Sequence, residues 1–386
     1  MTTHTGIAGS PRRGGICLRA AGRPDTEAAL TQFRAHLAAL DLDRCAAVAC
    51  AADAAGHYAR FQLADDFARA WVPGYDTTGI RERSRRDPQG QPRAECDLER
   101  EILIAMLAAP LDFEFPGCDE ALACVRMRAN IARAGARTAL AFHTTKAERP
   151  EDYWVDDPER GFIVRPGKSL IEALRLATQP EASGMLYSFS CYRATEYVIL
   201  LGIAQELATC NPPLFAQLQR QCETRVIRSA QFHDTFLIEY GSMEEPLPPQ
   251  YYVPGDRLWF RNPDAASSDI IGYEGSWVFY LGGGLFSNFW KSDQPYTLAS
   301  KCIEIYHWRH GARRDAGGEP AMDEDVVEAR VRATQADPQA AAEIVARMMR
   351  LRDPKGIYAE GGCIDTTREY PRRVCPGTAD LVLPGS

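Results

Sequence analysis

Cys191 is a candidate nucleophile, because it lies where a helix is expected to begin. Two serines at 188 and 190 are good helix N-cap residues, and an apolar run follows from Thr195 to Leu207. The positive end of a helix dipole favours a thiolate and can lower a cysteine pKa from about 8.5 by one to several units. The competing interpretation is a cysteine packed as a small apolar side chain.

A predicted hairpin would supply polar partners for this thiol. Two β-rich runs, 276–281 and 285–290, flank three consecutive glycines, which is typical of a hairpin with a three-residue loop. In that register Val278 pairs with Asn288, and Glu274 continues the same face if no bulge intervenes. A carboxylate and an amide would then project together from neighbouring strands. A surface hairpin with its polar side chains in water is the alternative.

Histidines and tryptophans add further candidates. If 302–308 forms a strand beside the hairpin, His307 would be placed to act as a base, whereas a structural histidine is the competing interpretation. His310 lies nearby, and His233 is another candidate for the same role. The indoles of three tryptophans would line an apolar tunnel to the site, although core packing explains them equally well. These predicted substrate-binding residues are Trp259, Trp277 and Trp290.

Composition excludes several classes of protein. The chain has 386 residues, 45% of them hydrophobic and 25% charged, which is ordinary for a globular protein. Its net charge of −8 is spread along the sequence, so nucleic acid is not an expected partner. The 12 cysteines show neither a C-x-x-C pair nor a Cys/His spacing typical of metal sites, and we therefore expect no metal and no cofactor.

Hydropathy indicates a cytoplasmic protein. The first thirty residues lack the continuous apolar run of a secretory signal, and no stretch reaches the eighteen apolar residues of a membrane-spanning helix. Many scattered thiols favour a reducing compartment. We therefore expect no membrane contact and a cytoplasmic location.

Four regions are expected along the chain. Residues 1–25 are rich in Gly, Arg, Thr and Pro and are predicted to be a flexible arm, followed by a small helical region over 26–95. Residues 96–320 have the strongest periodicity and are predicted to form the catalytic core. Residues 321–386 are expected to form a helical and irregular extension that wraps the core or is mobile.

Within the core, helices precede most of the strands. This order predicts an α+β fold, and helix, nucleophile helix and then antiparallel sheet is the order of papain-like cysteine enzymes. Besides the helix at Cys191, helices are predicted at 98–107, 120–133 and 169–176, and strands at 138–143, 153–155, 162–164, 235–240, 257–261, 276–281 and 285–290.

Several short motifs have the order and spacing of a known family. They are LAAPLDF at 107–113, VRMRANI at 125–131, YW at 153–154, FSCYRAT at 189–195, PGD at 254–256 with FRNP at 260–263, and YLG at 280–282. Over about residues 99–310 the chain thus resembles the bacterial spore-coat type of protein-glutamine gamma-glutamyltransferase, the compact transglutaminase known from Bacillus.

The resemblance implies a papain-like core of the NlpC/P60 type in which Cys191 attacks a glutamine amide, releases ammonia and passes the acyl group to a lysine. Partners would be proteins that bear glutamine and lysine, or small amines. In the family an acidic residue precedes the cysteine, a glutamate begins the strand before the Leu-Gly pair, and a histidine lies on the next strand. Here those positions hold Ser190, Ser276 and Asn288, and Glu274 replaces the glutamate only through a shift of two residues.

Three functions remain open. In a transglutaminase-like acyltransferase, Cys191 attacks, Glu274 accepts or shuttles the proton, and Asn288 orients or stabilises charge. If water reaches the thioester, the same residues give a cysteine amidase or peptidase. The missing family histidine also allows a non-catalytic interaction protein built on this fold.

Overall fold

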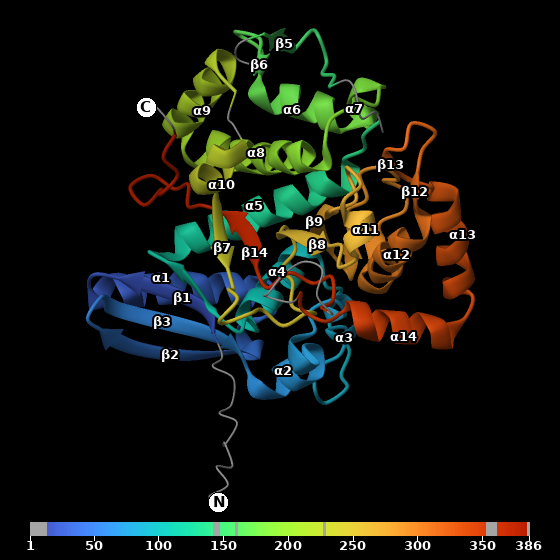
Figure 1. The fold of residues 1–386 in the computed structure, drawn as a ribbon. Coiled ribbons are helices and arrows are strands. Elements are labelled where there is room, and N and C mark those ends of the chain that lie inside the picture. The colour runs from blue at the N-terminus through green and yellow to red at the C-terminus, as the bar shows by residue number, and fades with distance from the viewer. Residues whose placement is uncertain (1–13, 142–146, 159–160, 227–228, 353–360, 384–386) are drawn as a thin grey trace, which may run out of the picture.

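The computed structural model describes residues 14–141, 147–158, 161–226, 229–352 and 361–383. At the N-terminal side, a four-stranded sheet in the order β2-β3-β1-β4 is covered by helix α1 (Figure 1). Its elements are β1 (Gly15–Ala20), α1 (Arg23–Ala39), β2 (Ala46–Asp53), β3 (Gly56–Leu63) and β4 (Asp112–Phe115). Short helices follow β3: α2 (Asp65–Trp71) and α3 (Ile80–Arg83).

This region differs from the predicted arm and helical segment. Part of the expected arm forms β1, which lies inside the sheet, and the expected helical segment contains a β-hairpin. Alanine-rich β2 has a weak strand propensity of its own, but all eight of its residues pair with β3. Strand pairing therefore overrides local propensity here. Residues 1–13 lie outside the described residues.

A layer of helices with a short β-hairpin at its outer edge packs against a second sheet, and its helices α4 and α5 also contact the N-terminal sheet. Helices α6 and α9 lie at the top of Figure 1, far from the N-terminal sheet. The central pair of the layer, α5 and α8, packs closely: a Cβ on Gly202 would meet a side-chain carbon of Ile131 at 2.5 Å. The elements of this layer are α4 (Leu98–Leu107), α5 (Cys118–Arg137), β5 (Trp154–Asp157), β6 (Gly161–Val164), α6 (Leu170–Thr178), α7 (Pro180–Ser183), α8 (Cys191–Cys210), α9 (Pro212–Thr224) and α10 (Ser229–Phe236).

The predicted helices at 98–107 and 169–176 and the hairpin around 153–164 are confirmed. The helix predicted at 120–133 is confirmed but longer, since α5 continues to Arg137, and Gly135 inside it allows close packing against Phe279. The strand predicted at 138–143 is wrong over its described part, where an isolated bridge joins Ala141 to Ser188. Its last two residues lie outside the described residues.

The second sheet has six strands in the order β11-β10-β9-β8-β14-β7. Strand β14 comes from the C-terminal tail yet lies between β8 and β7, as Figure 1 shows by its red colour beside the yellow β7. Part of the predicted outer extension is therefore built into the sheet. The strands are β7 (Leu237–Tyr240), β8 (Arg257–Arg261), β9 (Gly275–Gly282), β10 (Leu285–Phe286), β11 (Tyr296–Thr297) and β14 (Arg368–Pro371).

The β9–β10 hairpin is shorter than predicted. Leu285 pairs with Gly282 and Phe286 pairs with Tyr280, so β10 ends before Asn288. The predicted pairing of Val278 with Asn288 is wrong. Positive φ angles at all three glycines, 282–284, produce a tighter turn and a shifted register.

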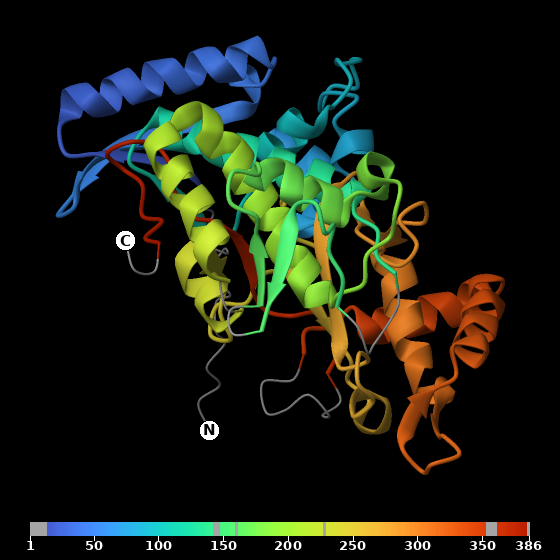
Figure 2. The same cartoon turned by 90° about the horizontal axis from the view of Figure 1, so that it is seen from above.

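The remaining elements gather on one side of the molecule, away from α1 (Figure 2). One of them is helix α12, which contains residues 302–308, so the strand predicted there is wrong. Buried Leu298, Cys302 and Ile305 recur at helical spacing, and Thr297 and Ser300 form a capping box, so the helix is locally encoded. These elements are α11 (Ala265–Ser268), α12 (Leu298–Gly311), β12 (Ala312–Arg314), β13 (Pro320–Met322), α13 (Glu324–Gln335) and α14 (Pro338–Met348).

Candidate functional site

Cys191 is the first residue of α8, as predicted from the sequence. Ser190 is extended at φ −64° and ψ 151°, and its hydroxyl accepts the backbone N–H of Arg193 at 3.2 Å. This N-cap bond satisfies one of the free donors at the helix start. The thiol is half-buried, and the backbone N–H groups of Trp277 and Tyr192 are directed toward it.

Burial raises the pKa of the Cys191 thiol. This effect outweighs the backbone N–H groups of Trp277, Tyr192 and Cys191 itself and the charge of Lys301, all of which lower the pKa. The expectation of a lowered pKa is therefore wrong for this structure. Desolvation disfavours the thiolate more than the start of the helix favours it. The thiol is protonated at neutral pH in this state and needs a proton acceptor to react.

Lys301 is a charged neighbour that sequence reasoning missed. It lies on α12, is 2% exposed, and its Nζ is 3.0 Å from Glu304 Oε2. The ammonium also lies 3.8 Å from the centroid of the Tyr296 ring. Burial lowers the pKa of Lys301, but Glu304 and Tyr296 together raise it by more. The net effect is a raised pKa, so the side chain remains a cation. No motif distinguishes this lysine from a solvent-facing one, and its burial depends on tertiary packing.

Two of the predicted tryptophans meet beside the nucleophile. The rings of Trp259 and Trp277 stack at 5.4 Å with an interplanar angle of 9°. Trp277 in turn meets Tyr192, the residue after the cysteine, edge-on at 5.4 Å. Gly275 leaves the space for this stack, because a Cβ there would collide with the Trp259 indole nitrogen. Trp290 lies elsewhere, in the loop after β10, where 39% of it is exposed.

Glu274 is exposed in the turn that precedes β9. Its Oε2 accepts the backbone N–H of Gly272 at 3.1 Å. Ser276, two residues on, pairs with Phe260 inside the sheet. In the described part of the chain no hydrogen bond or ion pair joins either side chain to Cys191, so the role predicted for Glu274 remains a prediction.

Asn288 is occupied with its own loop. Its Nδ2 donates to the carbonyl of Gln294 at 3.0 Å, and its Oδ1 accepts the N–H groups of Trp290 and Lys291 at 3.3 and 3.2 Å. Because β10 has already ended, Asn288 does not share a strand face with Glu274. The predicted juxtaposition of a carboxylate and an amide is therefore absent from the described residues.

His307 links two helices rather than facing the hairpin. Its Nε2 lies 2.7 Å from the hydroxyl of Thr334 on α13, and only 5% of the residue is exposed. Burial lowers the pKa of His307 to about 4, so the imidazole is neutral at pH 7. Its predicted placement depended on a strand at 302–308, which is a helix, so the structure removes the geometric basis for His307 as a base.

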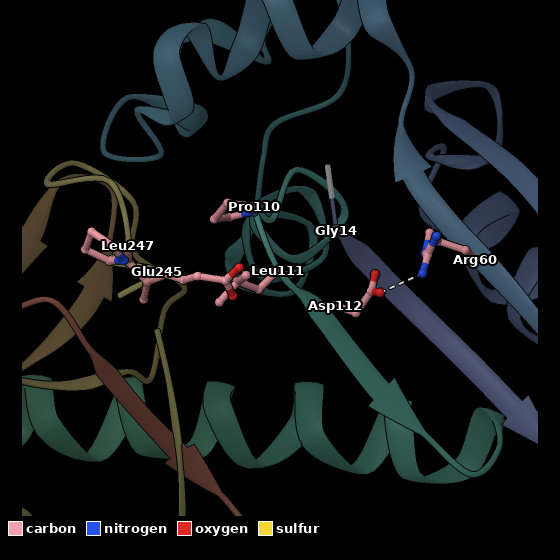
Figure 3. Close-up of a pocket in the computed structure, with 8 residues that line it drawn as sticks. Gly14, Arg60, Pro110, Leu111, Asp112, Glu245 and Leu247 are labelled. Atoms are coloured by element: carbon pink, nitrogen blue, oxygen red, sulfur yellow. Dashed lines mark hydrogen bonds and ion pairs between the residues drawn. The ribbon is translucent and has the colours of Figure 1, made fainter. Parts of the chain in front are cut away.

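Two cavities lie away from the thiol. One of about 580 Å³ lies between the N-terminal sheet and the loop 245–247, where Arg60 and Asp112 form an ion pair at 2.6 Å (Figure 3). Another, of about 280 Å³, lies beside the β9–β10 turn and is lined in part by Asn288 and Arg133. Cys191 lines neither cavity. The candidate site is therefore the junction of α8 with β9.

A metal-ligand cluster and a membrane-spanning helix are both absent from the described residues. Among them, no group of three or more His, Cys, Asp or Glu side chains is arranged to hold a metal ion. Within the same residues, none of the helices has the length and apolar character needed to span a bilayer.

Comparisons with known proteins identify the family. The family model for protein-glutamine gamma-glutamyltransferase matches residues 79–367, a range that contains the α8–β9 junction. A solved transglutaminase from Geobacillus stearothermophilus, without its C-terminal extension, is 19% identical over 55% of this chain and 98% of its own, with a TM-score of 0.37. No curated protein matches the chain. Because the family model spans most of the chain, the protein belongs to the protein-glutamine gamma-glutamyltransferase family.

Proposed function

We propose that this protein is a cysteine-dependent transglutaminase with a papain-like core, in which Cys191 is the nucleophile. The observation that supports this most directly is the thiol at the start of α8 with the Trp277 and Tyr192 N–H groups directed toward it. Amide donors at such a position stabilise negative charge, first on the thiolate and then on the oxyanion formed during attack.

In the proposed reaction, the Cys191 sulfur adds to the side-chain carboxamide carbon of a protein glutamine. The C–N bond then breaks, ammonia leaves, and a thioester remains on the enzyme. A lysine amine or a small primary amine attacks that thioester, forms the new amide and restores the thiol. The reaction consumes no oxidant and needs no cofactor.

The raised pKa of the thiol requires a base during attack. We propose Glu274 for this proton, because it immediately precedes the strand that carries Trp277. The cation of Lys301 supports the thiolate by charge. Asn288, His307 and Trp290 receive no role, since their contacts are made elsewhere.

Trp259 and Trp277 provide the proposed binding surface. Both indoles are half-buried, and their stack extends from Tyr192 to Arg261, whose guanidinium lies 4.0 Å from the centre of the Trp259 ring. An apolar surface of this kind binds the methylene groups of a glutamine or lysine side chain and displaces water. Exclusion of water favours attack on the thioester by an amine over its hydrolysis. This preference distinguishes a transglutaminase from an amidase.

A non-catalytic interaction protein is the second candidate. It is favoured by the protonated thiol and by the lack of a described hydrogen bond between Cys191 and a carboxylate or imidazole. In that case the aromatic stack would bind a protein ligand and the thiol would have no chemical role.

One experiment separates these functions. Purified protein is incubated with a glutamine-bearing protein and a labelled primary amine, while released ammonia is measured in parallel. A transglutaminase incorporates the amine and releases ammonia, an amidase releases ammonia without incorporation, and an interaction protein does neither. The Cys191→Ala variant is the control, and amine incorporation by that variant would refute the proposal.

A further inference from the structure

A buried network of charges connects the nucleophile helix to the C-terminal strand. At its centre, Arg257 on β8 donates through Nε to Oε2 of Glu369 on β14. The other carboxylate oxygen of Glu369 lies 2.7 Å from Nδ1 of His233 on α10. The Arg257 and Glu369 side chains are 2% and 10% exposed, so this ion pair is shielded from water.

Arg257 lies against both aromatic residues that surround the thiol. Its guanidinium is 4.8 Å from the centre of the Trp277 ring and 5.3 Å from that of Tyr192. The Arg257 Nη1 donates to the Thr195 hydroxyl at 3.4 Å, and that hydroxyl donates to the carbonyl of Tyr192 at 2.7 Å. The guanidinium thus supports the two residues whose N–H groups are directed toward Cys191.

Glu369 lies just outside the region that matches the family model, which ends at residue 367. It is supplied by β14, whose residues pair along β7 and at Glu369 with Arg257 itself. The tail therefore contributes an anchor for a side chain in the core.

We infer that Glu369 is a positioning residue for the thiol chemistry and that it acts through Arg257. This inference rests on the proposed function, because it takes Cys191 as the nucleophile. The ion pair with Glu369 fixes the orientation of the planar Arg257 guanidinium, which lies against both rings. Without the Glu369 carboxylate, a buried cation has lost its partner and turns toward water or another acceptor. Tyr192 and Trp277 then lose their common support, and their N–H groups move away from the sulfur.

The test is the rate of alkylation of Cys191 by iodoacetamide, followed by peptide mass spectrometry between pH 6 and pH 10. In Glu369→Gln we expect the midpoint of the rate profile to rise by about one pKa unit, which makes labelling about tenfold slower at neutral pH. Glu369→Asp, which keeps the charge, should recover part of the rate. Arg257→Lys should resemble Glu369→Gln, because a lysine cannot stack on both rings.

The chain offers two matched controls. Glu239 is the cross-strand partner of Glu369 on β7, is exposed, and has no described contact with Arg257, so Glu239→Gln should leave the profile unchanged. Cys50 is an exposed thiol on the distant strand β2, and its labelling in the same sample reports probe activity. A constant Cys50 rate with a slower Cys191 rate is the expected pattern.

The inference is overturned if Glu369→Gln keeps the wild-type profile, or if Glu239→Gln shifts it equally. If Glu369→Gln does not fold, Glu369→Asp and Arg257→Lys test the inference instead. Wild-type pH–rate profiles of Cys191 alkylation in both variants overturn it. The readout is independent of turnover. If Cys191→Ala still incorporates amine, the proposed function fails while the effect of Glu369 on Cys191 labelling is judged separately.

Discussion

The backbone N–H of Trp277 is directed toward the thiol of Cys191, although the two residues belong to different elements, β9 and α8. The shortness of β10 is what exposes this part of β9. Strand β10 pairs with Tyr280 and Gly282 but not with the earlier residues of β9, so the edge near Trp277 is left for the start of α8. An unpaired strand edge here becomes a source of donors for chemistry.

Replacing Cys191 with alanine should abolish amine incorporation and leave folding intact. The residue is half-buried and the replacement removes little volume, so we expect a cost of about 1 kcal/mol or less in unfolding free energy. Amine incorporation and thermal melting measure the two effects. Cys191→Ser provides a matched control, because a hydroxyl in the same place lacks the acidity of a thiol. Activity in either variant at the wild-type level would exclude Cys191 as nucleophile.

Replacing Glu274 with glutamine should lower turnover by about 10² to 10⁴ if this carboxylate accepts the proton. The side chain is exposed, so the melting temperature should change little. Ser276→Ala is the comparison, because Ser276 occupies the position that aligns with the family glutamate. A larger loss in Ser276→Ala than in Glu274→Gln would show that the base function does not belong to Glu274.

Replacing Gly275 with alanine should displace the Trp259 indole and weaken substrate binding. A Cβ at this position would collide with the indole nitrogen and lie 2.5 Å from the carbonyl oxygen of Phe260. We expect a higher KM for the glutamine substrate and altered tryptophan fluorescence. Gly117→Ala is the control, since its φ of 176° is extended and a Cβ there meets nothing within 4 Å. Equal changes in both variants would argue against a specific effect on the stack.

The start of α8 was predictable because its signal is local: a serine cap followed by an apolar run. The position of Glu369 was not. Its strand lies in a proline- and glycine-rich tail and forms only by pairing with β7, whose register sets Glu369 opposite Glu239 more than a hundred residues earlier. Local propensity carries no information about such a pairing.

The predicted positions of Asn288 and His307 on β-strands were wrong because local sequence does not fix the register and type of an element. Each depended on the register or type of one element, and a shift of a few residues moves every side chain to another environment. A strand was expected at 302–308, whereas the buried positions there repeat with helical spacing. The fold class survived these errors because it depends on the order of many elements.

His307 should contribute to stability above its ordinary pKa and not to the reactivity of Cys191. Burial first, and then the charges of His310, Arg330 and Arg309, lower its pKa from 6.5 to about 4. Because the folded-state pKa is depressed, the stabilisation is present above pH 6.5 and is lost as the pH falls toward 4. On lowering the pH from 7.5 to 5, urea unfolding should therefore show a smaller loss of unfolding free energy in His307→Gln, which can still bond to Thr334, than in the wild type.

The His307→Gln change should leave Cys191 labelling unaffected. A step near pH 6.5 in the labelling profile that His307→Gln removes would instead assign this histidine to the thiol.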